Sequence, residues 1–430
     1  MDTNKQKILI IGGGGREHAI GWKVKQSPRA GQIYFAPGNA GTVKIGINVA
    51  IKATEADKLL DFAKKEKIDL TLAIPDDPLA EGIVDLFQKE GLRIFGPTKA
   101  AAQLESSKAY AKNFMTHHGL PTAKYHVFND FALAETYLKT QIYPLVVKAS
   151  GLALGKGVFI CQNYDDAIEA LRGIMVDKAF GDSGNEVVIE EFLSGPEISI
   201  HAFSDGTHHS MFPPAQDHKR AGDDDQGPNT GGMGTIAPIT FLSLEQMKKI
   251  EDSIVAPTIA GMAKENQPFV GVLYPGLIVT AGGPKILEFN ARFGDPETET
   301  YMRLLQTDLL DIVDACIDGK LEDLQIRWRN ISACTIVLAS GGYPGDYEKG
   351  KVISGVDEAE QNPDVIVFHA GTATRDGALV TNGGRVLGVS AIGSDLQEAL
   401  DTAYRAVGKI SFEGMQYRKD IGRKALELMK

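Results

Sequence analysis

The sequence predicts a multidomain α/β and α+β protein, with an N-terminal domain built on a parallel α/β sheet and a small, mainly β C-terminal domain. Strand and helix patterns alternate over the first hundred residues, which is typical of a parallel sheet covered by helices. Glycine-rich loops separate short β-branched strands in the middle of the chain, and the strand signals shorten from Asn330 onward. At roughly 150 residues per domain, the 430 residues suggest about three domains, which we place at 1–101, 102–328 and 329–430.

Each element of the N-terminal domain follows from its local pattern of apolar residues. Short apolar runs bounded by polar or turn residues predict strands, and apolar residues at helical spacing predict amphipathic helices. Gly96-Pro97 is a turn signal that ends this unit. The expected strands are Lys7–Ile11, Ile33–Ala36, Leu70–Ile74 and Arg93–Phe95, and helices are expected over Glu17–Gln26 and Glu55–Lys65.

The later elements follow in the same way. Residues 101–122 are expected to be helical, and a long polar insert covers Gln216–Gly234. Asn382-Gly383-Gly384 is a hairpin signal, so we expect the two strands that flank it to pair. The expected strands are Leu145–Lys148, Gly157–Cys161, Val187–Glu191, Ser332–Leu338, Val365–Phe368, Ala378–Thr381 and Arg385–Ser390, with a helix over Asp165–Val176.

The composition argues against several classes of function. The net charge of −11 lacks the basic field that binders of nucleic acid or anionic membranes need, and no apolar run approaches the ~18 residues that span a bilayer. Cys161, Cys316 and Cys334 are far apart and lack CxxC spacing, which indicates reduced, buried thiols in a cytoplasmic protein. The histidines show no metal-ligand spacing, because adjacent pairs such as His117-His118 diverge by ~100° on a helix, so zinc or iron is not expected.

The run Gly12-Gly13-Gly14-Gly15 follows a predicted strand and precedes a predicted helix. Glycines at this place let a phosphate approach the helix N-terminus, as in dinucleotide-binding proteins. Glu17, however, interrupts that fingerprint, and Pro37-Gly38-Asn39 stands where an acidic residue would bind ribose. A phosphate ligand, NAD and a mere tight turn all stay open as interpretations.

Lys148 and Lys156 enclose a glycine loop between two predicted strands. The segment fails the P-loop pattern twice, because Ser150 and Gly157 stand where that motif needs Gly and Ser or Thr. We interpret it as a strand–loop–strand flap whose lysines bind a polyphosphate and whose glycines, Gly155 and Gly157 among them, allow closure. A surface hairpin with two solvated lysines is the alternative.

Two acidic residues end the next apolar strand. Glu190 and Glu191 follow Val187–Ile189 directly, and an unpaired charge at a buried strand end is costly. A functional role would be hydrogen bonding to an adenine edge here and, through Glu197, to ribose hydroxyls. An ordinary strand end that meets solvent would explain the two acids nearly as well.

The segment Leu287–Glu297 carries the strongest signal. Because the side chains of a strand alternate between its faces, Glu288, Asn290 and Arg292 project to one side, while two phenylalanines face the core. A carboxylate and an amide oxygen suit Mg²⁺, and a guanidinium suits an oxyanion or a carboxylate. Asp295-Pro296-Glu297 then predicts a helix start with Asp as the N-cap. A plain amphipathic edge strand is the alternative.

Two further segments, Gln216–Arg220 and Gly227–Gly234, flank the acidic stretch Asp223–Asp225. The second one is rich in glycine, so its backbone amides could surround an anion. The alternative is a disordered surface insert.

Taken together, these segments resemble the phosphoribosylamine–glycine ligases, also called glycinamide ribonucleotide synthetases, of the ATP-grasp superfamily. The resemblance runs nearly end to end, and several matches in the same order are far more specific than any single one. The matching segments are Gly12–Ala19, Pro37–Thr42, Gln216–Arg220, Gly227–Gly234, Gly271–Leu277, Glu288–Glu297 and Tyr417–Gly422.

The resemblance implies an ATP-grasp core with a mobile flap subdomain at about residues 123–190. It implies the second step of purine synthesis, in which glycine is ligated to 5-phosphoribosylamine at the expense of ATP through a glycyl phosphate intermediate. The implied ligands are ATP, Mg²⁺ or Mn²⁺, glycine and 5-phosphoribosylamine. A cytoplasmic monomer without a nucleic-acid or membrane partner is expected.

The resemblance also assigns the candidate residues to these ligands. ATP would be bound by Lys148, Lys156, Gly155, Gly157, Glu190, Glu191, Phe192, Leu193 and Glu197, and the metal by Glu288 and Asn290. Catalytic roles would fall to Arg292, Asp295 and Lys219. The substrates would be bound by Gly12, Gly13, Gly14, Gly15, Pro37, Gly38 and Asn39 around the ribosyl phosphate, and by Pro75, Asp76, Asp217, Arg220, Asn229, Thr230, Gly231 and Gly232.

Four residues depart from the family pattern. Ile74-Pro75-Asp76 stands in place of Gly-Pro-Glu, Ser150 in place of Asp, and Pro275 in place of Ala. A weakened or non-catalytic ATP-binding relative, or a ligase for another acid and amine, is therefore the alternative. An NAD-linked oxidoreductase would rest on Gly12–Gly15 alone.

Overall fold

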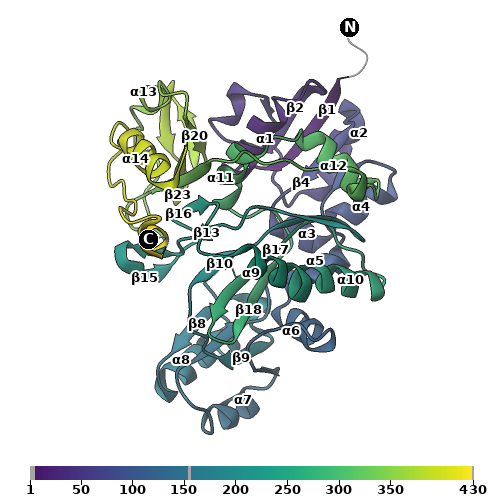
Figure 1. Ribbon diagram of the computed structural model, residues 1–430, viewed down its shortest axis with the longest axis vertical. Helices are drawn as coiled ribbons and strands as arrows, with labels where there is room; N and C mark the ends of the chain where they lie inside the picture. The colour runs from purple at the N-terminus through teal and green to yellow at the C-terminus, as the bar shows by residue number, and fades with distance from the viewer. Residues whose placement is uncertain (1–4, 154–155, 429–430) are drawn as a thin grey trace.

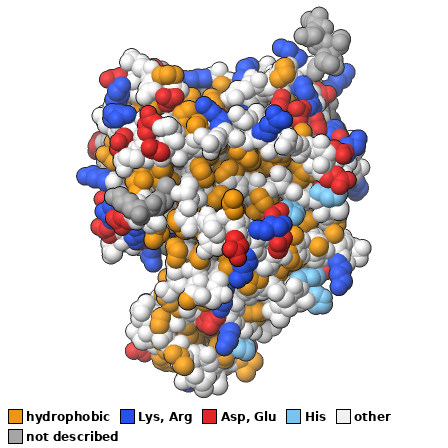
Figure 2. All heavy atoms as spheres, in the orientation of Figure 1, with side chains coloured by type: hydrophobic (Ala, Val, Ile, Leu, Met, Phe, Trp, Pro, Cys, Tyr) orange, Lys and Arg blue, Asp and Glu red, His pale blue; other side chains and the backbone are white. Residues whose placement is uncertain are grey.

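The computed structural model describes residues 5–153 and 156–428, and these residues form six β-sheets with helices packed on them (Figure 1). Gly155, predicted in the flap, lies outside the described residues. Within the described part of the chain, no helix combines the length and the apolar character needed to cross a membrane. Basic and acidic side chains are interspersed on the face shown in Figure 2, rather than gathered in one basic field.

The N-terminal sheet is fully parallel, with the strand order β3-β2-β1-β4-β5. The four predicted strands are confirmed, and β3 is an additional short edge strand. Residues 8–11 are fully buried, which explains why their apolar run is continuous instead of alternating. The elements are β1 (Gln6–Gly12), α1 (Gly15–Val24), β2 (Ala30–Pro37), a 3-10 turn (Thr42–Lys44), β3 (Ile47–Asn48), α2 (Ala56–Glu66), β4 (Leu70–Ala73), α3 (Asp76–Glu81), α4 (Ile83–Lys89) and β5 (Ile94–Phe95).

Two helices follow where the sequence predicted one over 101–122. α5 (Lys99–Ser106) and α6 (Lys108–His117) meet at Ser107, whose backbone is extended at φ −138° and ψ 107°. The Ser107 hydroxyl accepts a hydrogen bond from Tyr110 N at 3.1 Å and so caps α6. One serine therefore ends the first helix and starts the second, a signal that apolar periodicity does not contain.

The flap has a four-stranded antiparallel sheet of its own, in the order β6-β9-β7-β8. Side chains such as Val147, Leu171 and Ile189 form a buried cluster confined to this unit, which occupies the lower end of the molecule in Figure 1. Because its core is separate, the flap is a packing unit distinct from the sheets above it. Its elements are β6 (Tyr125–Phe128), α7 (Phe131–Leu138), β7 (Leu145–Ala149), β8 (Val158–Cys161), α8 (Tyr164–Met175), a 3-10 turn (Gly181–Gly184) and β9 (Val187–Glu191).

The central sheet is organised around the long strand β17 (Val270–Thr280), which pairs antiparallel with β10, β11 and β18. A register shift between Gly276 and Leu277 interrupts its pairing with β18 (Gly283–Asn290). The other elements are β10 (Glu197–Ser199), β11 (Ala202–Asp205), β12 (His209–Met211), α9 (Leu244–Ile250), a π-helical turn (Glu251–Val255), α10 (Ala256–Lys264), α11 (Glu297–Leu304), α12 (Leu309–Ile317) and a 3-10 turn (Leu321–Asp323).

The C-terminal sheet has the order β13-β16-β19-β23-β20, so it includes one strand of the polar insert, β13, and the strand that begins at the end of the insert, β16. The insert contains β13 (Gln216–Asp217), β14 (Arg220–Gly222), a 3-10 turn (Asp223–Asp225) and β15 (Gln226–Asn229), and β16 spans Gly234–Ala237. The remaining elements are β19 (Ser332–Ala339), α13 (Val356–Ala359), β20 (Val365–His369), β21 (Thr372–Arg375), β22 (Ala378–Thr381), β23 (Arg385–Gly393), α14 (Leu396–Val407) and α15 (Arg423–Leu428). The sheet thus draws strands from both sides of the boundary predicted at 328–329, and that boundary stays a prediction.

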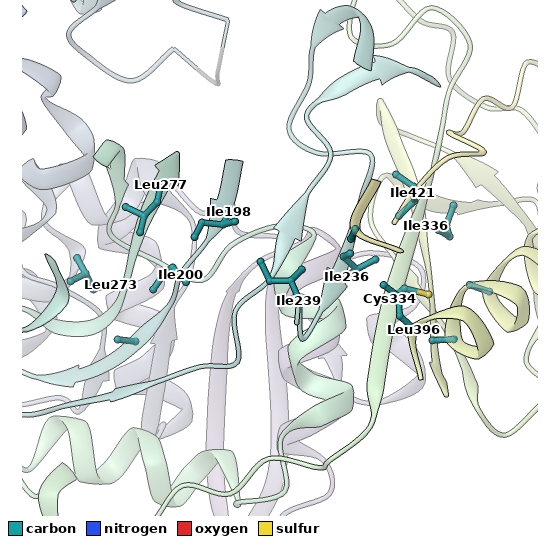
Figure 3. Close-up of a cluster of buried hydrophobic side chains, with 14 of the residues drawn as sticks. Ile198, Ile200, Ile236, Ile239, Leu273, Leu277, Cys334, Ile336, Leu396 and Ile421 are labelled. Carbon is teal, nitrogen blue, oxygen red and sulfur yellow. The ribbon is translucent and has the colours of Figure 1, made fainter. Parts of the chain in front are cut away.

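A continuous hydrophobic core joins the central sheet to the C-terminal sheet. Ile198 and Leu277 belong to the central sheet, whereas Ile336 and Leu396 belong to the C-terminal region. Ile236, on strand β16 directly after the insert, lies between these two groups in Figure 3. The segment that follows the insert therefore joins the two parts of the core.

The predicted hairpin through Asn382-Gly383-Gly384 is wrong. β22 pairs with β21, and β23 pairs with β19 on one side and β20 on the other. Asp376 and Gly377 join β21 to β22 with φ values of 49° and 79°, the left-handed geometry that a two-residue hairpin turn needs. β23 is buried along most of its length, so it takes a central position with a partner on each side.

Candidate active site

A cavity of about 750 Å³ lies where the N-terminal sheet, the flap, the central sheet and the C-terminal sheet meet. Arg16 reaches it from α1, Lys148 from β7, Asn290 from β18 and Arg385 from β23. The volume is typical of pockets for small-molecule ligands. Because helices of the N-terminal domain, the flap, the central sheet and the C-terminal region all contribute side chains, the cavity exists only in the assembled chain.

Twelve predicted site residues line this cavity: Asp76, Lys148, Lys156, Gly157, Asp217, Lys219, Thr230, Gly231, Glu288, Asn290, Arg292 and Asp295. Glu197 borders a small adjoining cavity together with Lys219 and Glu288. The other predicted residues within the described ranges are not among those that line the large cavity, namely Gly12, Gly13, Gly14, Gly15, Pro37, Gly38, Asn39, Pro75, Glu190, Glu191, Phe192, Leu193, Arg220, Asn229 and Gly232.

Glu288 and Asn290 lie two residues apart on β18, and both side chains reach the cavity. Although burial alone would raise the pKa of Glu288, the charges of Lys219, Lys148 and Lys108 lower it to about 2. Lys219 Nζ lies 3.4 Å from Glu288 Oε1. An ionised carboxylate next to an amide is a hard oxygen donor set, and these two residues therefore fit Mg²⁺ or Mn²⁺.

The Glu190 carboxylate is only 2% exposed and lies between two lysines. Lys148 Nζ pairs with one of its oxygens, and Lys112 Nζ lies 2.5 Å from the other. Burial would raise the pKa of Glu190, but the two lysines lower it below its ordinary value. Both oxygens thus fix lysines at the cavity wall, while the expected contact of Glu190 with an adenine edge stays a prediction.

Helix α6 contributes two lysines, Lys108 and Lys112, that sequence reasoning missed. Burial lowers the pKa of Lys108, and the nearby Glu288 opposes that effect. Lys108 Nζ also donates to the carbonyl of Gly151, at the start of the glycine loop, at 3.2 Å. The sequence did contain a signal for these two lysines, because Lys108 and Lys112 are four residues apart and so lie on the same face of the helix predicted over 101–122.

Arg292 is held by a carboxylate that the sequence analysis did not single out. Its Nη2 lies 2.9 Å from Glu105 Oε1 and donates to Asn290 Oδ1 at 3.0 Å. The second oxygen of Glu105 accepts a hydrogen bond from Ala291 N at 2.8 Å. Glu105 therefore orients both the guanidinium and the strand end that carries the predicted metal ligands.

Asp295 does not cap α11, and this part of the prediction is wrong. The helix begins at Glu297 with Pro296 as the N-cap and without a side-chain capping bond. The Asp295 carboxylate instead pairs with Arg385 at 3.0 Å, because the guanidinium offers a charged partner inside the cavity. Arg385, from the C-terminal sheet, also donates to the carbonyl of Gly231 at 2.7 Å and was missed.

The loop that follows β19 covers one side of the cavity, with Tyr343 to Tyr347 among the lining residues. The Tyr343 hydroxyl accepts a hydrogen bond from Gly231 N at 3.1 Å. Thr230 Oγ1 donates to Lys219 O at 2.8 Å and accepts from Gly232 N at 2.9 Å. The glycine loop of the insert is thus fixed by its own threonine and by the C-terminal region.

A second pair of acids lies in the cavity wall. Glu297 is 1% exposed, and its Oε1 accepts hydrogen bonds from Ser199 Oγ at 2.8 Å and Tyr274 Oη at 2.6 Å. Burial and the charge of Glu297 raise the pKa of Asp217 well above its ordinary value. The pKa values of the two acids are thus shifted in opposite directions, that of Asp217 upward and that of Glu297 downward despite its burial, the latter helped by its hydrogen bonds from Tyr274 and Ser199.

The glycine run at the start of α1 is closely packed. Gly14 N donates to Glu17 Oε2 at 2.5 Å, and a Cβ at Gly13 would lie 2.5 Å from Gly38 O. Asn39 Nδ2 donates to Gly13 O at 2.9 Å and to His369 O at 2.7 Å. Because the Glu17 carboxylate occupies a donor of the helix N-terminus, the geometry disfavours NAD bound in the dinucleotide manner.

The other predicted residues have structural partners. Arg220 and Asn229 face each other across the β14–β15 pair. Glu191 Oε1 accepts from Lys124 N at 3.0 Å and lies 3.1 Å from Lys285 Nζ. Pro75 is the N-cap of α3, Phe192 is exposed, and Leu193 is half-buried.

Two residues that depart from the family pattern, Asp76 and Ser150, have identifiable interaction partners. Burial alone would raise the pKa of Asp76, yet the charges of Arg292 and Arg16 lower it, so this shorter acid still faces both guanidinium groups. The Ser150 hydroxyl accepts a hydrogen bond from Ala109 N at 3.1 Å, in the first turn of α6. Both substituted residues are therefore integrated into the walls of the cavity.

Comparison with known proteins matches nearly the whole chain to one family. Three protein-family models match consecutively: "Phosphoribosylglycinamide synthetase, N domain" over residues 6–105, the "ATP-grasp (A) domain" of the same family over 106–298, and its "C domain" over 333–424. These matches confirm the resemblance and the fold class predicted from the sequence.

Individual relatives agree with this assignment. The chain is 48% identical over 415 residues to the phosphoribosylamine–glycine ligase of Caldanaerobacter subterraneus, covering 96% of this chain and 99% of the relative. It is 48% identical to the trifunctional purine biosynthetic protein adenosine-3 of Gallus gallus, covering 98% of this chain but 42% of that protein.

Two solved structures share the fold of this chain. The crystal structure of a phosphoribosylamine–glycine ligase from Thermotoga maritima has a TM-score of 0.85 at 37% identity, covering 96% of this chain and 99% of that one. The biotin carboxylase domain of 2-oxoglutarate carboxylase from Hydrogenobacter thermophilus, solved with MgADP, has a TM-score of 0.74 at 17% identity. It covers 99% of this chain and 94% of that chain, and it supports the fold alone.

Proposed function

This chain belongs to the phosphoribosylglycinamide synthetase family, and from that premise we propose how its residues join glycine to 5-phosphoribosylamine. The activity is that of a phosphoribosylamine–glycine ligase of the ATP-grasp type, which acts in purine biosynthesis. The observation that carries the assignment of roles is the convergence of Lys148, Lys108, Glu288, Asn290 and Arg292 on one cavity.

In the first step, a glycine carboxylate oxygen attacks the γ-phosphorus of ATP. An O–P bond forms, the bond to the β-phosphate oxygen breaks, and ADP leaves with that electron pair. Lys108, Lys148 and Lys156 bind the phosphate oxygens and hold the triphosphate in line for the attack. Such positioning and charge stabilisation supply most of the catalysis of phosphoryl transfer.

Glu288 and Asn290 would hold Mg²⁺ or Mn²⁺. When bound, the ion neutralises charge on the phosphate oxygens. Lys219 lies 3.4 Å from Glu288 and keeps that carboxylate ionised without occupying both of its oxygens. The residues of this chain thus provide a charged oxygen donor at the place where the phosphates converge.

In the second step, the amine of 5-phosphoribosylamine attacks the carbonyl carbon of glycyl phosphate. The new C–N bond replaces the C–O bond to phosphate, which leaves with the electron pair and takes up the proton that the nitrogen loses. Arg292 and the Asn229–Gly232 loop face the glycine carboxylate and the acyl phosphate, and Asp295 with Arg385 holds that loop in place. Lys219 contributes a further positive charge at the same wall.

The acceptor enters from the side of the N-terminal sheet. Arg16 and Asp76 line the cavity there, and Gly12–Gly15 with Pro37–Asn39 lies behind them as the cradle proposed for the ribosyl phosphate. Phosphate binding to this cradle requires that Glu17 release Gly14 N, since its carboxylate now accepts that hydrogen bond. Pro75 and Asp217 complete the acceptor side of this proposal.

The nucleoside of ATP is assigned to the strand end at Glu190, Glu191, Phe192 and Leu193, with Glu197 near the ribose. Support comes from the place of β9, because its neighbour β7 carries Lys148 into the cavity. Phe192 and Leu193 follow the end of β9 directly, so we assign the base edge to their backbone, because lysines engage the Glu190 side chain and Glu191 N donates to Lys124 O. The flap at 123–190 is proposed to close over the nucleotide, since it has a core of its own.

We also propose a cytoplasmic monomer. Cys161, Cys316 and Cys334 are buried and free, which suits a reducing compartment. The domain limits 1–101, 102–328 and 329–430 belong to the same proposal.

The test is an assay of ADP release with purified protein, ATP, Mg²⁺, glycine and freshly prepared 5-phosphoribosylamine. ADP should accumulate only when all components are present, and glycinamide ribonucleotide should form in equal amount. A panel of other amino acids in place of glycine checks the acid specificity. ADP release that does not depend on glycine would contradict the assigned roles.

A further inference from the structure

We propose that His117, His118 and Glu265 form a binding site for a divalent transition-metal ion such as Zn²⁺. The site lies outside the cavity described above, and ligand atoms of the three side chains lie within 4.8 Å of one another. Two imidazoles and one carboxylate form a ligand set that zinc commonly takes, with a fourth position left for water.

The two histidine rings meet because the helix ends between them. His117 is the last residue of α6, whereas His118 is the C-cap with φ −97° and ψ 7°. The change in backbone direction brings the ring centroids to 4.9 Å, with an interplanar angle of 76°. The divergence expected for adjacent residues within a helix therefore does not apply to this pair.

Glu265 is already oriented toward the histidines. Its Oε1 lies 2.8 Å from His118 Nε2, and its Oε2 accepts a hydrogen bond from Tyr110 Oη at 3.2 Å. Such a partner behind a metal ligand fixes its orientation and raises metal affinity. Glu265 is also the C-cap of α10, so its backbone is anchored.

The His118 ring is held with Nε2 directed at Glu265. Phe114 packs against it with ring centroids 4.4 Å apart. On the other side, a Cβ at Gly261 would lie 2.9 Å from His118 Nδ1, so a glycine there admits the ring. Packing thus leaves Nε2 as the ligand atom, and the exposed His117 leaves the site open to ions from solvent.

Electrostatics favour a cation at this place. The C-terminal end of α6 carries partial negative charge from the helix dipole, and the Glu265 carboxylate adds a formal charge. The bound ion would replace the proton that His118 and Glu265 now share, and it would link the end of α6 to the end of α10. These helices lie side by side in Figure 1, and α6 also carries Lys108 and Lys112 into the cavity.

The experiment is a calorimetric titration of the full-length, tag-free protein with Zn²⁺, in excess Mg²⁺ so that hard oxygen sites are filled. One equivalent of Zn²⁺ should bind to the wild type, and its dissociation constant should rise by at least about tenfold in H117A. Y110F should weaken binding by about tenfold through the loss of the hydrogen bond to Glu265. Zinc should raise the melting temperature of the wild type but not that of H117A.

The control is H208A, because His208 also touches two carboxylates, Asp205 at 3.2 Å and Glu322 at 3.1 Å, without a second histidine. This variant should bind Zn²⁺ like the wild type. His117 is exposed, so its replacement leaves the core intact, and circular dichroism checks that. Equal zinc affinity in wild type and folded H117A would overturn the proposal, whatever the ligase activity of either protein.

Discussion

The Arg385 guanidinium lies 3.0 Å from the Asp295 carboxylate, and the same group donates to the carbonyl of Gly231 at 2.7 Å. Arg385 starts a strand of the C-terminal sheet, whereas Asp295 follows the last strand of the central sheet. The C-terminal region therefore takes a direct part in shaping the cavity, as a partner of the residues assigned to the acyl phosphate.

Replacing Arg385 should slow catalysis without unfolding the protein. In R385Q, Asp295 and the loop at Gly231 lose their common charged donor, and we expect kcat to fall by about 10²-fold through misplacement of the loop. Steady-state ADP release measures kcat, and circular dichroism checks the fold. R375Q, at an exposed position of β21, is the matched control and should behave like the wild type. An unchanged kcat in R385Q would show that Arg385 is not needed to position Asp295 and the loop at Gly231 for catalysis.

Replacing Glu288 should weaken metal-dependent turnover. The pKa of Glu288 is lowered to about 2, so E288Q removes a full negative charge at neutral pH. We expect a loss on the order of 10²–10³ in kcat, together with a higher Mg²⁺ requirement. Rates measured over a range of Mg²⁺ concentrations separate the two effects. E90Q, which disturbs a partly exposed pair with Lys64 outside the cavity, should retain near wild-type rates, and full activity of E288Q would exclude Glu288 as a metal ligand.

Acid should destabilise the contact between α1 and β20 through His18. Burial, with the nearby His369 and Lys44, lowers the pKa of His18 to about 3, and His18 Nδ1 accepts a hydrogen bond from His369 N at 2.9 Å. The unfolded chain binds this proton near pH ~6.5. Below that pH the unfolded state therefore binds more protons, and the free energy of unfolding falls by up to about 1.4 kcal/mol per pH unit from this group, until pH approaches about 3.

Melting temperatures between about pH 7 and about pH 5 test this linkage. H18N should be less stable than the wild type at neutral pH, but its melting temperature should fall less steeply with acid. H126N, at an exposed position in the flap, should keep the wild-type slope. If the melting temperatures of H18N and wild type fall in parallel as the pH is lowered, His18 does not contribute to the acid destabilisation.

A surface ion network should stabilise the packing of α12 against the N-terminal sheet. Asp314 pairs with Arg29 and, at 2.8 Å, with Arg93, which also reaches Asp318 at 2.8 Å. Because the groups are partly exposed, D314N should lower the free energy of unfolding by only about 0.5–1 kcal/mol at low salt.

The difference between D314N and wild type should shrink at about 1 M salt, where exposed charges are screened. Thermal unfolding at low and high salt measures it. D357N removes a looser and highly exposed pair with Lys44 at 3.6 Å, and it should change stability less. A salt-independent effect of D314N would point to packing instead of charge.

Local patterns predict about half of the strands in the described part of the chain. Val187–Glu191 matches β9 at both ends, and the buried run at 8–11 was recognisable as a parallel core strand. Which strands pair was harder to predict, because the partner of a strand depends on how deeply both strands are buried, and that burial is set by segments far away in the sequence. The Asp376-Gly377 turn and the Gly383-Gly384 turn look equally suited to a hairpin, and only the burial of β23 decides between them.

The site was predictable where one strand presents its residues in alternation, as at Glu288 and Asn290. It was not predictable where distant segments meet, as with Glu105 and Arg292 or Arg385 and Asp295. The chain does carry a hint for Lys108 and Lys112, which share a helix face. The burial of Glu190 between two lysines could not be predicted, because two acids at the end of an apolar strand are equally typical of a strand end that meets solvent.

The pairing of β16 with β19 also has a consequence for how the chain is made. β16 ends at Ala237, and its partner β19 begins at Ser332. During synthesis, one edge of β16 therefore stays unpaired until nearly a hundred further residues have been added. An unpaired strand edge invites association with other nascent chains. Fragments that stop before Ser332 are therefore expected to precipitate on expression, and the protein reaches its native form only once its last quarter has left the ribosome.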